Sequence, residues 1–320
     1  PGSGTFGMEA VARQFATDKR CLVIRNGWFS YRWTEIFEKG NIPAQSIVLK
    51  AQRISQEAQA PFAPAEIEKV LSFIKREKPD LVFAPHVETS SGIMLPVDYI
   101  RSIADTIHSV GGMFVLDCIA SGAIWVDMGA CGVDVLISAP QKGWSSSPCC
   151  GLVMLSSLAE ERIKNTVSSS YSCDLLKWLN VMKNYEKGSY AYHTTMPTDS
   201  LKRFRDIMKE TEEYGFEKVK DEQQELGDKV RDMLSKKGFK SVAASGFEAP
   251  GVIVSYTDDK DIHSGEKFTK IGFQVAAGVP LKCDEPKDYK TFRLGLFGLD
   301  KLNNPKRTIE NLEKALIQIL

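Results

Sequence analysis

The segment MFVLDCIASGAIWVDMGACGVDVLISAPQK, residues 113–142, decides the fold of this chain. It holds two near-continuous apolar runs, residues 113–116 and 133–138, which are typical of strands covered by helices on both faces, as in parallel sheets. Asp117 directly follows the first run, and Lys142 follows the second. Ligands of open α/β sheets bind outside the carboxyl ends of the strands, so both residues are candidates for a functional site.

Helical and strand patterns alternate upstream of this segment. Met8, Val11, Ala12 and Phe15 have the i, i+3, i+4, i+7 spacing of a helix with one buried face. Further helices are predicted over residues 31–39, from about residue 64, and around residues 100–107. The predicted strands are residues 21–25, 46–51, 80–84 and, downstream, 152–155. This order predicts an α/β fold with a mainly parallel, doubly wound sheet.

The pattern changes near Asp199. A charge-rich helical stretch reaches about Lys237, and short strands near residues 252–256 and 292–296 precede a terminal helix with buried spacing at its apolar positions. We therefore predict a large domain over residues 1–212 and a smaller C-terminal α+β domain over residues 213–320.

Composition limits the function classes. The chain has 320 residues with 41 basic and 41 acidic side chains, and this balance does not indicate a nucleic-acid or membrane-surface partner. No apolar run reaches the ~20 residues of a membrane span. Seven cysteines, an odd number, favour a reducing, cytoplasmic location, and scattered histidines predict no metal site. The chain opens within a glycine-rich motif, so we expect an N-terminal part to be missing.

Three features together suggest a cofactor. Residues 2–5 (GSGT) precede a helix whose free amides favour a phosphate, Asp117 needs a cationic or N–H partner, and Lys142 is placed to be a desolvated amine. Each has an ordinary alternative: a helix lead-in, a turn cap and a solvated lysine. The combination is what pyridoxal 5'-phosphate (PLP) requires, namely an anion site, a partner for the pyridine nitrogen and an amine.

Several segments carry a family resemblance in the same order along nearly the whole chain. They are SGT (3–5) with MEA (8–10), NGWF (26–29) with Arg32 and Trp33, HVETSSG (86–92), Leu116-Asp117 with Ala120-Ser121, SAPQK (138–142), YHTTMP (192–197) and FRLG (292–295). These residues resemble the class V aminotransferases of PLP-dependent transferase fold type I, most closely the alanine–glyoxylate and serine–pyruvate aminotransferases.

The resemblance implies roles for individual residues. Lys142 would be the Schiff-base lysine and Asp117 the partner of the pyridine nitrogen. Phe29 would stack on the ring, with Trp28 as the alternative one position away. The residues implied around the phosphate and the phenolic side of PLP are Ser3, Gly4, Thr5, Thr89 and Gln141. Tyr192 and Thr195 would reach the phosphate of a neighbouring subunit in a homodimer, unless they only form a polar turn.

Arg293 lies between apolar neighbours in a predicted strand of the small domain, where a guanidinium could bind the α-carboxylate of an amino acid. A structural salt bridge is the alternative.

The resemblance implies ping-pong transamination between an alanine- or serine-type donor and a small 2-oxo acid such as glyoxylate or pyruvate. A PLP-dependent lyase or cysteine desulfurase, and an inactive binding module, stay open, and residues 143–151 depart from the family pattern with a longer, cysteine-bearing loop.

Overall fold

A computed structural model describes residues 1–320 of the chain. The helices are α1 (Gly4–Phe15), α2 (Trp28–Gly40), α3 (Ile67–Glu77), α4 (Val97–Ser109), α5 (Ser157–Ile163), α6 (Leu175–Glu186), α7 (Thr198–Tyr214), α8 (Phe216–Lys236), α9 (Lys260–Ser264), α10 (Glu266–Lys270), α11 (Leu299–Leu302) and α12 (Pro305–Ile319). The strands are β1 (Arg20–Arg25), β2 (Gln45–Lys50), β3 (Gln52–Arg53), β4 (Phe62–Ala63), β5 (Leu81–Pro85), β6 (Val87–Glu88), β7 (Ile93–Met94), β8 (Met113–Asp117), β9 (Val135–Ser138), β10 (Leu152–Leu155), β11 (Val252–Tyr256), β12 (Ala276–Ala277) and β13 (Thr291–Gly295).

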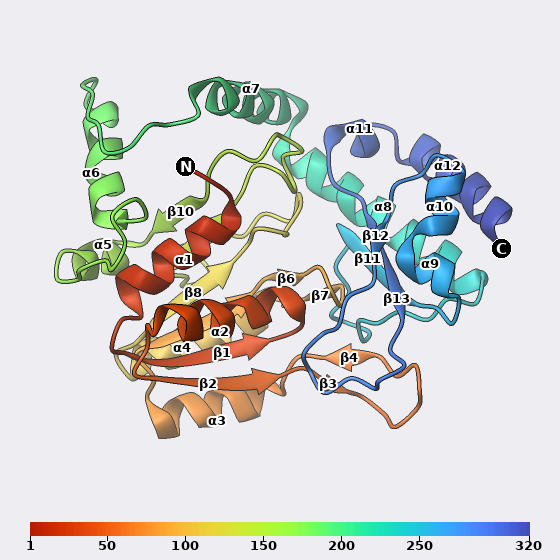
Figure 1. The fold of residues 1–320 in the computed structure, drawn as a ribbon, viewed down its shortest axis with the longest axis horizontal. Coiled ribbons are helices and arrows are strands. Elements are labelled where there is room, and N and C mark those ends of the chain that lie inside the picture. Colours follow the sequence, from red (N-terminus) through yellow and green to blue (C-terminus); the bar gives the residue numbers. More distant parts are fainter.

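A six-stranded sheet forms the centre of the large domain, in the order β10-β9-β8-β5-β1-β2 (Figure 1). Five of its strands are parallel, and β10 runs antiparallel to β9 at one edge. The expectation of a mainly parallel sheet is therefore confirmed. Because the parallel strands share one direction, the residues that follow β5, β8 and β9 meet at the same edge of the sheet.

Helices cover both faces of this sheet, which explains the near-continuous apolar strands. Successive side chains of a strand point to opposite faces, so Leu81 and Phe83 of β5 pack into one core with α1 and α2. Val82 and Ala84 of the same strand pack into a second core with α3 and α4.

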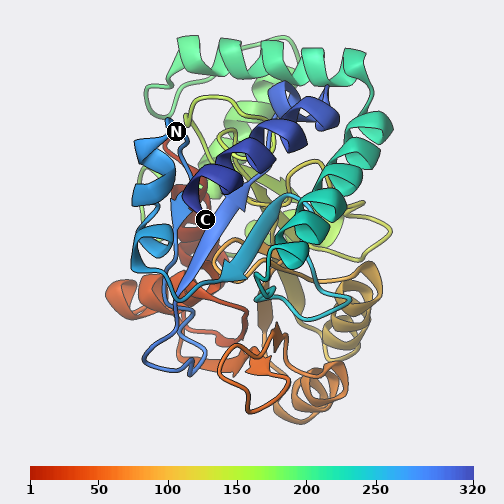
Figure 2. The same cartoon turned by 90° about the vertical axis from the view of Figure 1, so that its right-hand side faces the viewer.

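The C-terminal part has its own small antiparallel sheet, in the order β11-β13-β12, packed with α8, α9, α10 and α12 around a third apolar core (Figure 2). The charge-rich stretch that we predicted as one helical region is two helices. Gly215 separates α7 from α8 with a φ of 105°, a conformation that favours glycine. The division after residue 212 stays a prediction.

None of the sequence patterns predicted α5, α6, α9, α10, α11 or the two-residue strands. None of the helices combines the length and the hydropathy that crossing a membrane requires.

Candidate active site

The predicted site residues of the large domain lie at the carboxyl ends of three neighbouring strands. Asp117, the last residue of β8, is paired in register with Pro85 of β5 and with Ile137 of β9. The His86 amide donates to the Asp117 carbonyl at 2.8 Å, so the segment leading to Thr89 starts beside Asp117. Lys142 follows β9 by four residues. The fold thus gathers polar residues that are 53 positions apart in the chain, from Thr89 to Lys142.

The first turn of α1 closes one side of this edge. Ser3 is the residue before α1, and its hydroxyl caps no helix amide, so it is available for another partner. A Cβ added at Gly4 would lie 2.6 Å from Cδ1 of Ile119 and 3.1 Å from Cβ of Ala139. Glycine therefore lets the helix N-terminus approach both the loop after Asp117 and the segment before Lys142. Helix N-termini with free amides are favourable sites for phosphate.

Asp117 is a buried carboxylate without a cationic partner. Its Oδ1 accepts one hydrogen bond, from the Ile119 amide at 2.9 Å. Burial raises the pKa of Asp117 to about 7, the nearby charge of Glu88 adds to the rise, and the Ile119 amide and Arg32 oppose it. A protonated ring nitrogen would supply the missing positive charge.

Lys142 is an amine in a partly desolvated position. Burial lowers the pKa of Lys142 from its ordinary value, and the positive charges of Arg293 and Arg32 lower it further. The following residue packs closely, because a Cβ at Gly143 would lie 2.5 Å from the Gly122 carbonyl oxygen. A lysine with a lowered pKa has a larger fraction of neutral, nucleophilic amine at neutral pH.

Phe29 lies between two guanidinium groups of the site. The centre of its ring is 5.1 Å from Cζ of Arg32 and 5.8 Å from Cζ of Arg293. Trp28 instead packs on Tyr31, with ring centres 5.8 Å apart, and on the Lys282 ammonium. Of the two aromatic candidates, Phe29 is therefore the one that shares contacts with the cations around Lys142.

Arg293 has no carboxylate partner, so the alternative of a structural salt bridge is not realised. In β13 its Nε donates to the Ala277 carbonyl at 2.8 Å, and Nη1 lies 3.4 Å from the Thr89 carbonyl oxygen. Burial lowers the pKa of Arg293, while Glu88 and Tyr289 oppose the change. Its Nη2 donates to no protein group and the Nη1 contact is long, so the guanidinium keeps donors for a carboxylate.

The chemistry of these residues fits PLP. The amide oxygen of Gln141 is buried without a donor, a carboxylate and an amine stand at adjacent strand ends, and the helix N-terminus next to them is free. No group of three or more His, Cys, Asp or Glu is placed to hold a metal ion.

The sequence analysis missed the part that Glu88 plays. This fully buried carboxylate accepts hydrogen bonds from the amides of Phe29, Ser30 and Ser90 and from both serine hydroxyls. It caps the N-terminus of α2, where a negative charge interacts favourably with the helix dipole. Its hydrogen bond with the Phe29 amide thereby holds Phe29 in place. The only sequence signal for Glu88 was its place in the polar run 86–92, which follows a predicted strand.

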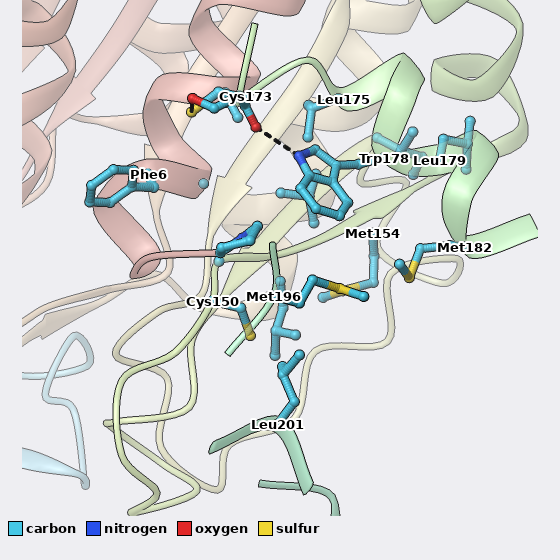
Figure 3. A pocket seen from close by; sticks show the side chains of 18 of the residues that line it. Phe6, Cys150, Met154, Cys173, Leu175, Trp178, Leu179, Met182, Met196 and Leu201 are labelled. Atoms are coloured by element: carbon cyan, nitrogen blue, oxygen red, sulfur yellow. Dashed lines mark hydrogen bonds between the residues drawn. The ribbon is translucent and has the colours of Figure 1, made fainter. Parts of the chain in front are cut away.

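Tyr192 and Thr195 lie apart from the other candidates within this chain. Both are exposed, in the segment between α6 and α7, and Tyr192 retains 78% of its surface. The adjoining Met196 and Pro197 line an apolar cavity of about 380 Å³, together with Phe6 of α1, Cys150 and Trp178 (Figure 3). Neither Lys142 nor Asp117 lines this cavity.

The large side chain of the loop after Lys142 packs in an aromatic cluster. Trp144 packs on Trp125 and Phe204, with ring centres 5.2 and 5.9 Å apart. Cys149 and Cys150 are buried with their Sγ atoms 3.9 Å apart, and burial together with Cys149 raises the pKa of Cys150 to about 12.

The chain is similar in sequence to known aminotransferases. The profile of the family "Aminotransferase class-V" matches residues 34–269. Alanine–glyoxylate aminotransferase 1 of Saccharomyces cerevisiae is 27% identical over 94% of this chain and 78% of its own length. A 2-aminoethylphosphonate–pyruvate transaminase of Paraburkholderia phymatum is 26% identical over 99% of this chain and 82% of its own length.

Solved structures show the same fold. An alanine–glyoxylate aminotransferase from Nostoc sp. superposes with a TM-score of 0.81 at 20% identity, over 99% of this chain and 80% of that one. The fold expected from the sequence, PLP-dependent transferase fold type I, is thus confirmed. Since the family profile covers most of the sequence, the chain belongs to the class V aminotransferases, a PLP-dependent family.

Proposed function

We propose that this protein binds PLP at Lys142 and transfers an amino group from an amino acid to a small 2-oxo acid. The observation that carries the proposal is the placement of Asp117 and Lys142 after adjacent parallel strands, with the free N-terminus of α1 beside them. PLP, when bound, supplies an electron sink for the bond broken at the substrate Cα and carries the amino group between the two acids.

Each residue around the site then has a task. The phosphate of PLP would be held by Ser3, Gly4, Thr5 and Gln141. Thr89 would contact the phenolic side of the cofactor, and Phe29 would stack on the face of its ring. The Asp117 carboxylate keeps the ring nitrogen protonated, and this contact in turn stabilises a charge that is otherwise buried alone. Arg293 binds the α-carboxylate of the substrate and orients its Cα.

Lys142 also moves the proton. With PLP bound, the neutral Nζ of Lys142 would accept the proton lost from the substrate Cα and would then donate it, on the same face, to the cofactor carbon that receives the amino group. The neighbouring charges of Arg293 and Arg32 favour this neutral form, because they lower the pKa of Lys142 toward the working pH.

The relatives support the substrate class. The names of these relatives pair alanine with glyoxylate and 2-aminoethylphosphonate with pyruvate. We therefore propose an alanine- or serine-type donor, glyoxylate or pyruvate as acceptor, and ping-pong kinetics.

We further propose a cytoplasmic homodimer in which Tyr192 and Thr195 reach the phosphate of the partner subunit. Their exposure within one chain supports this assignment. Analytical sedimentation tests the oligomeric state, and we expect a dimer. If Tyr192 contacts the phosphate of the partner's PLP, the Tyr192→Phe variant should bind PLP more weakly than the wild type.

A cysteine desulfurase fits the structure less well. Its nucleophile would have to be a thiolate near Lys142, whereas Cys149 and Cys150 are buried and burial raises the pKa of Cys150 to about 12. An inactive binding module of the same fold predicts that PLP does not bind or that nothing turns over.

One experiment tests the central proposal. The absorbance spectrum is recorded with and without added PLP, followed by borohydride reduction and mapping of the labelled peptide. We expect a long-wavelength band, a label on Lys142, and loss of both in Lys142→Ala. A label on another lysine, or activity of the Ala variant at the wild-type rate, would overturn the assignment.

A further inference from the structure

Arg32 is a cation of the site that has no assigned task. It lies on α2, one turn after Phe29, and its Nη1 donates a hydrogen bond to Oγ1 of Thr5 at 3.0 Å. The chain's ion pairs do not include Arg32, and this is the only hydrogen bond it makes to another side chain. A guanidinium has five N–H donors, so most of its capacity is left for a ligand.

The contact with Thr5 also fixes the direction of the Thr5 hydroxyl. Because the guanidinium donates to Oγ1, the hydroxyl proton must point to another acceptor. Thr5 belongs to the first turn of α1, where free amides and the helix dipole already favour an anion. Arg32 therefore adds a full positive charge and an oriented O–H donor to the same anion site.

We propose that Arg32 is a phosphate-recognition residue, which binds the phosphate ester of the cofactor directly and positions the Thr5 hydroxyl to donate to it. This inference rests on the proposed PLP site and goes beyond it by giving a role to a residue of α2. The planar guanidinium suits phosphate oxygens, which it can bind bidentately.

The electrostatics of the site agree with this position. The charge of Arg32 partly opposes the rise that burial causes in the pKa of Asp117, and it adds to the fall that burial and Arg293 cause in the pKa of Lys142, so the guanidinium acts on both residues as well as on Thr5. An anion seated against Arg32 would screen that charge. The substrate carboxylate already has a candidate partner in Arg293, whose Nη2 donates to no protein group, and this leaves Arg32 for the other anion.

The test compares PLP with pyridoxal, which lacks the phosphate. Dissociation constants are measured by absorbance and fluorescence titration for the wild type, Arg32→Met and Arg32→Lys. We expect Arg32→Met to weaken PLP binding about 10- to 100-fold and to leave pyridoxal binding within about twofold, since one charge-assisted contact is lost. Arg32→Lys keeps the positive charge but loses the planar guanidinium, so its dissociation constant for PLP should lie between those of the wild type and Arg32→Met.

A matched control comes from α3. Arg76 stacks on Phe73 at 5.2 Å with the same helical spacing as Arg32 on Phe29, but on the exposed surface. Arg76→Met should change neither affinity. In a double-mutant cycle, Thr5→Val should cost less in the Arg32→Met background than in the wild type, because the two side chains act together.

The outcomes distinguish failure of the proposed function from failure of the proposed role of Arg32. If the wild type binds no PLP, the proposed function fails. If it binds PLP and Arg32→Met weakens PLP and pyridoxal equally, Arg32 only supports the fold and the phosphate role is wrong. If both affinities are unchanged while the KM of a dicarboxylic amino acid rises, Arg32 binds a second substrate acid and the proposal is also overturned.

Discussion

One oxygen of the Glu88 carboxylate accepts hydrogen bonds from both the amide and the hydroxyl of Ser30, at 2.8 and 2.7 Å. These two residues are 58 positions apart, and their contact joins β6 to the first turn of α2. Since Phe29 precedes Ser30, the same contact sets where the aromatic ring stands over the site. Glu88 is thus a positioning residue whose charge is balanced by N–H and O–H donors and by the helix dipole rather than by a cation.

Replacing Glu88 with Gln should destabilise the fold. The amide side chain keeps the shape, but it removes the charge and places an NH₂ group among donors. We expect a loss of about 2–3 kcal/mol in the free energy of unfolding, as for buried hydrogen bonds to a charged group. Urea denaturation measures it, with Glu68→Gln on the exposed face of α3 as the control that should change little. Equal stability of both variants would contradict the capping role.

Glu88 also illustrates where sequence reasoning stopped. The apolar runs before Asp117 and Lys142 predicted both strands, because hydrophobic pattern is a local property, and the two residues became site candidates from their places after these strands. All polar residues of the run 86–92 are buried, and which of them caps α2 depends on the position of that distant helix. The same holds for Arg32, whose partner Thr5 is brought to it only by the packing of α1 on α2.

Other misses have similar causes. Gly215 ends α7 in a chain segment whose charge pattern looks continuous, and only its positive φ shows the break. Only Leu175 and Val181 of α6 are buried, so the spacing of its apolar residues gave a weak signal. The antiparallel direction of β10 is decided by how the chain returns after Lys142, which hydrophobicity does not encode.

Asp117→Asn should change how stability depends on pH in the cofactor-free protein. The folded-state pKa of about 7 lies above the ordinary value of 3.8, so between these values the folded chain binds more protons than the unfolded chain. Stability of the wild type therefore falls as the pH rises through this window. The Asn variant lacks this loss and should gain about 1–3 kcal/mol relative to the wild type between pH 5 and pH 8.

Urea denaturation at a series of pH values tests this prediction. Asp105→Asn, at an exposed position of α4, serves as the control and should follow the wild type. A difference between wild type and Asp117→Asn that does not vary with pH would show that burial does not shift this carboxyl group. With PLP bound, the order should reverse, because the ring nitrogen then stabilises the charged carboxylate.

Arg293→Met should separate substrate binding from cofactor binding. The loss of a bidentate, charge-assisted contact predicts a decrease in kcat/KM for amino acids of about 10- to 100-fold. PLP affinity should stay within about twofold, in contrast to Arg32→Met. The stability of the cofactor-free variant should change little, since the half-buried Arg293 has no ionic partner and only the Ala277 and Thr89 carbonyls lose a donor. Unchanged kinetics would refute the carboxylate role.

Gly4→Ala should damage the anion site through packing alone. The new Cβ would meet Cδ1 of Ile119 at 2.6 Å and Cβ of Ala139 at 3.1 Å, so α1 must shift away from the strand ends. We expect a loss of about 1–3 kcal/mol in stability, the usual range for overpacking, and weaker PLP binding. Ile119→Val removes the closer atom, so the double variant should recover part of both losses. Gly129→Ala, whose Cβ would have its nearest neighbour at 3.6 Å, is the control. If the second substitution rescues neither stability nor PLP affinity, close approach of α1 to this loop is not what Gly4 provides.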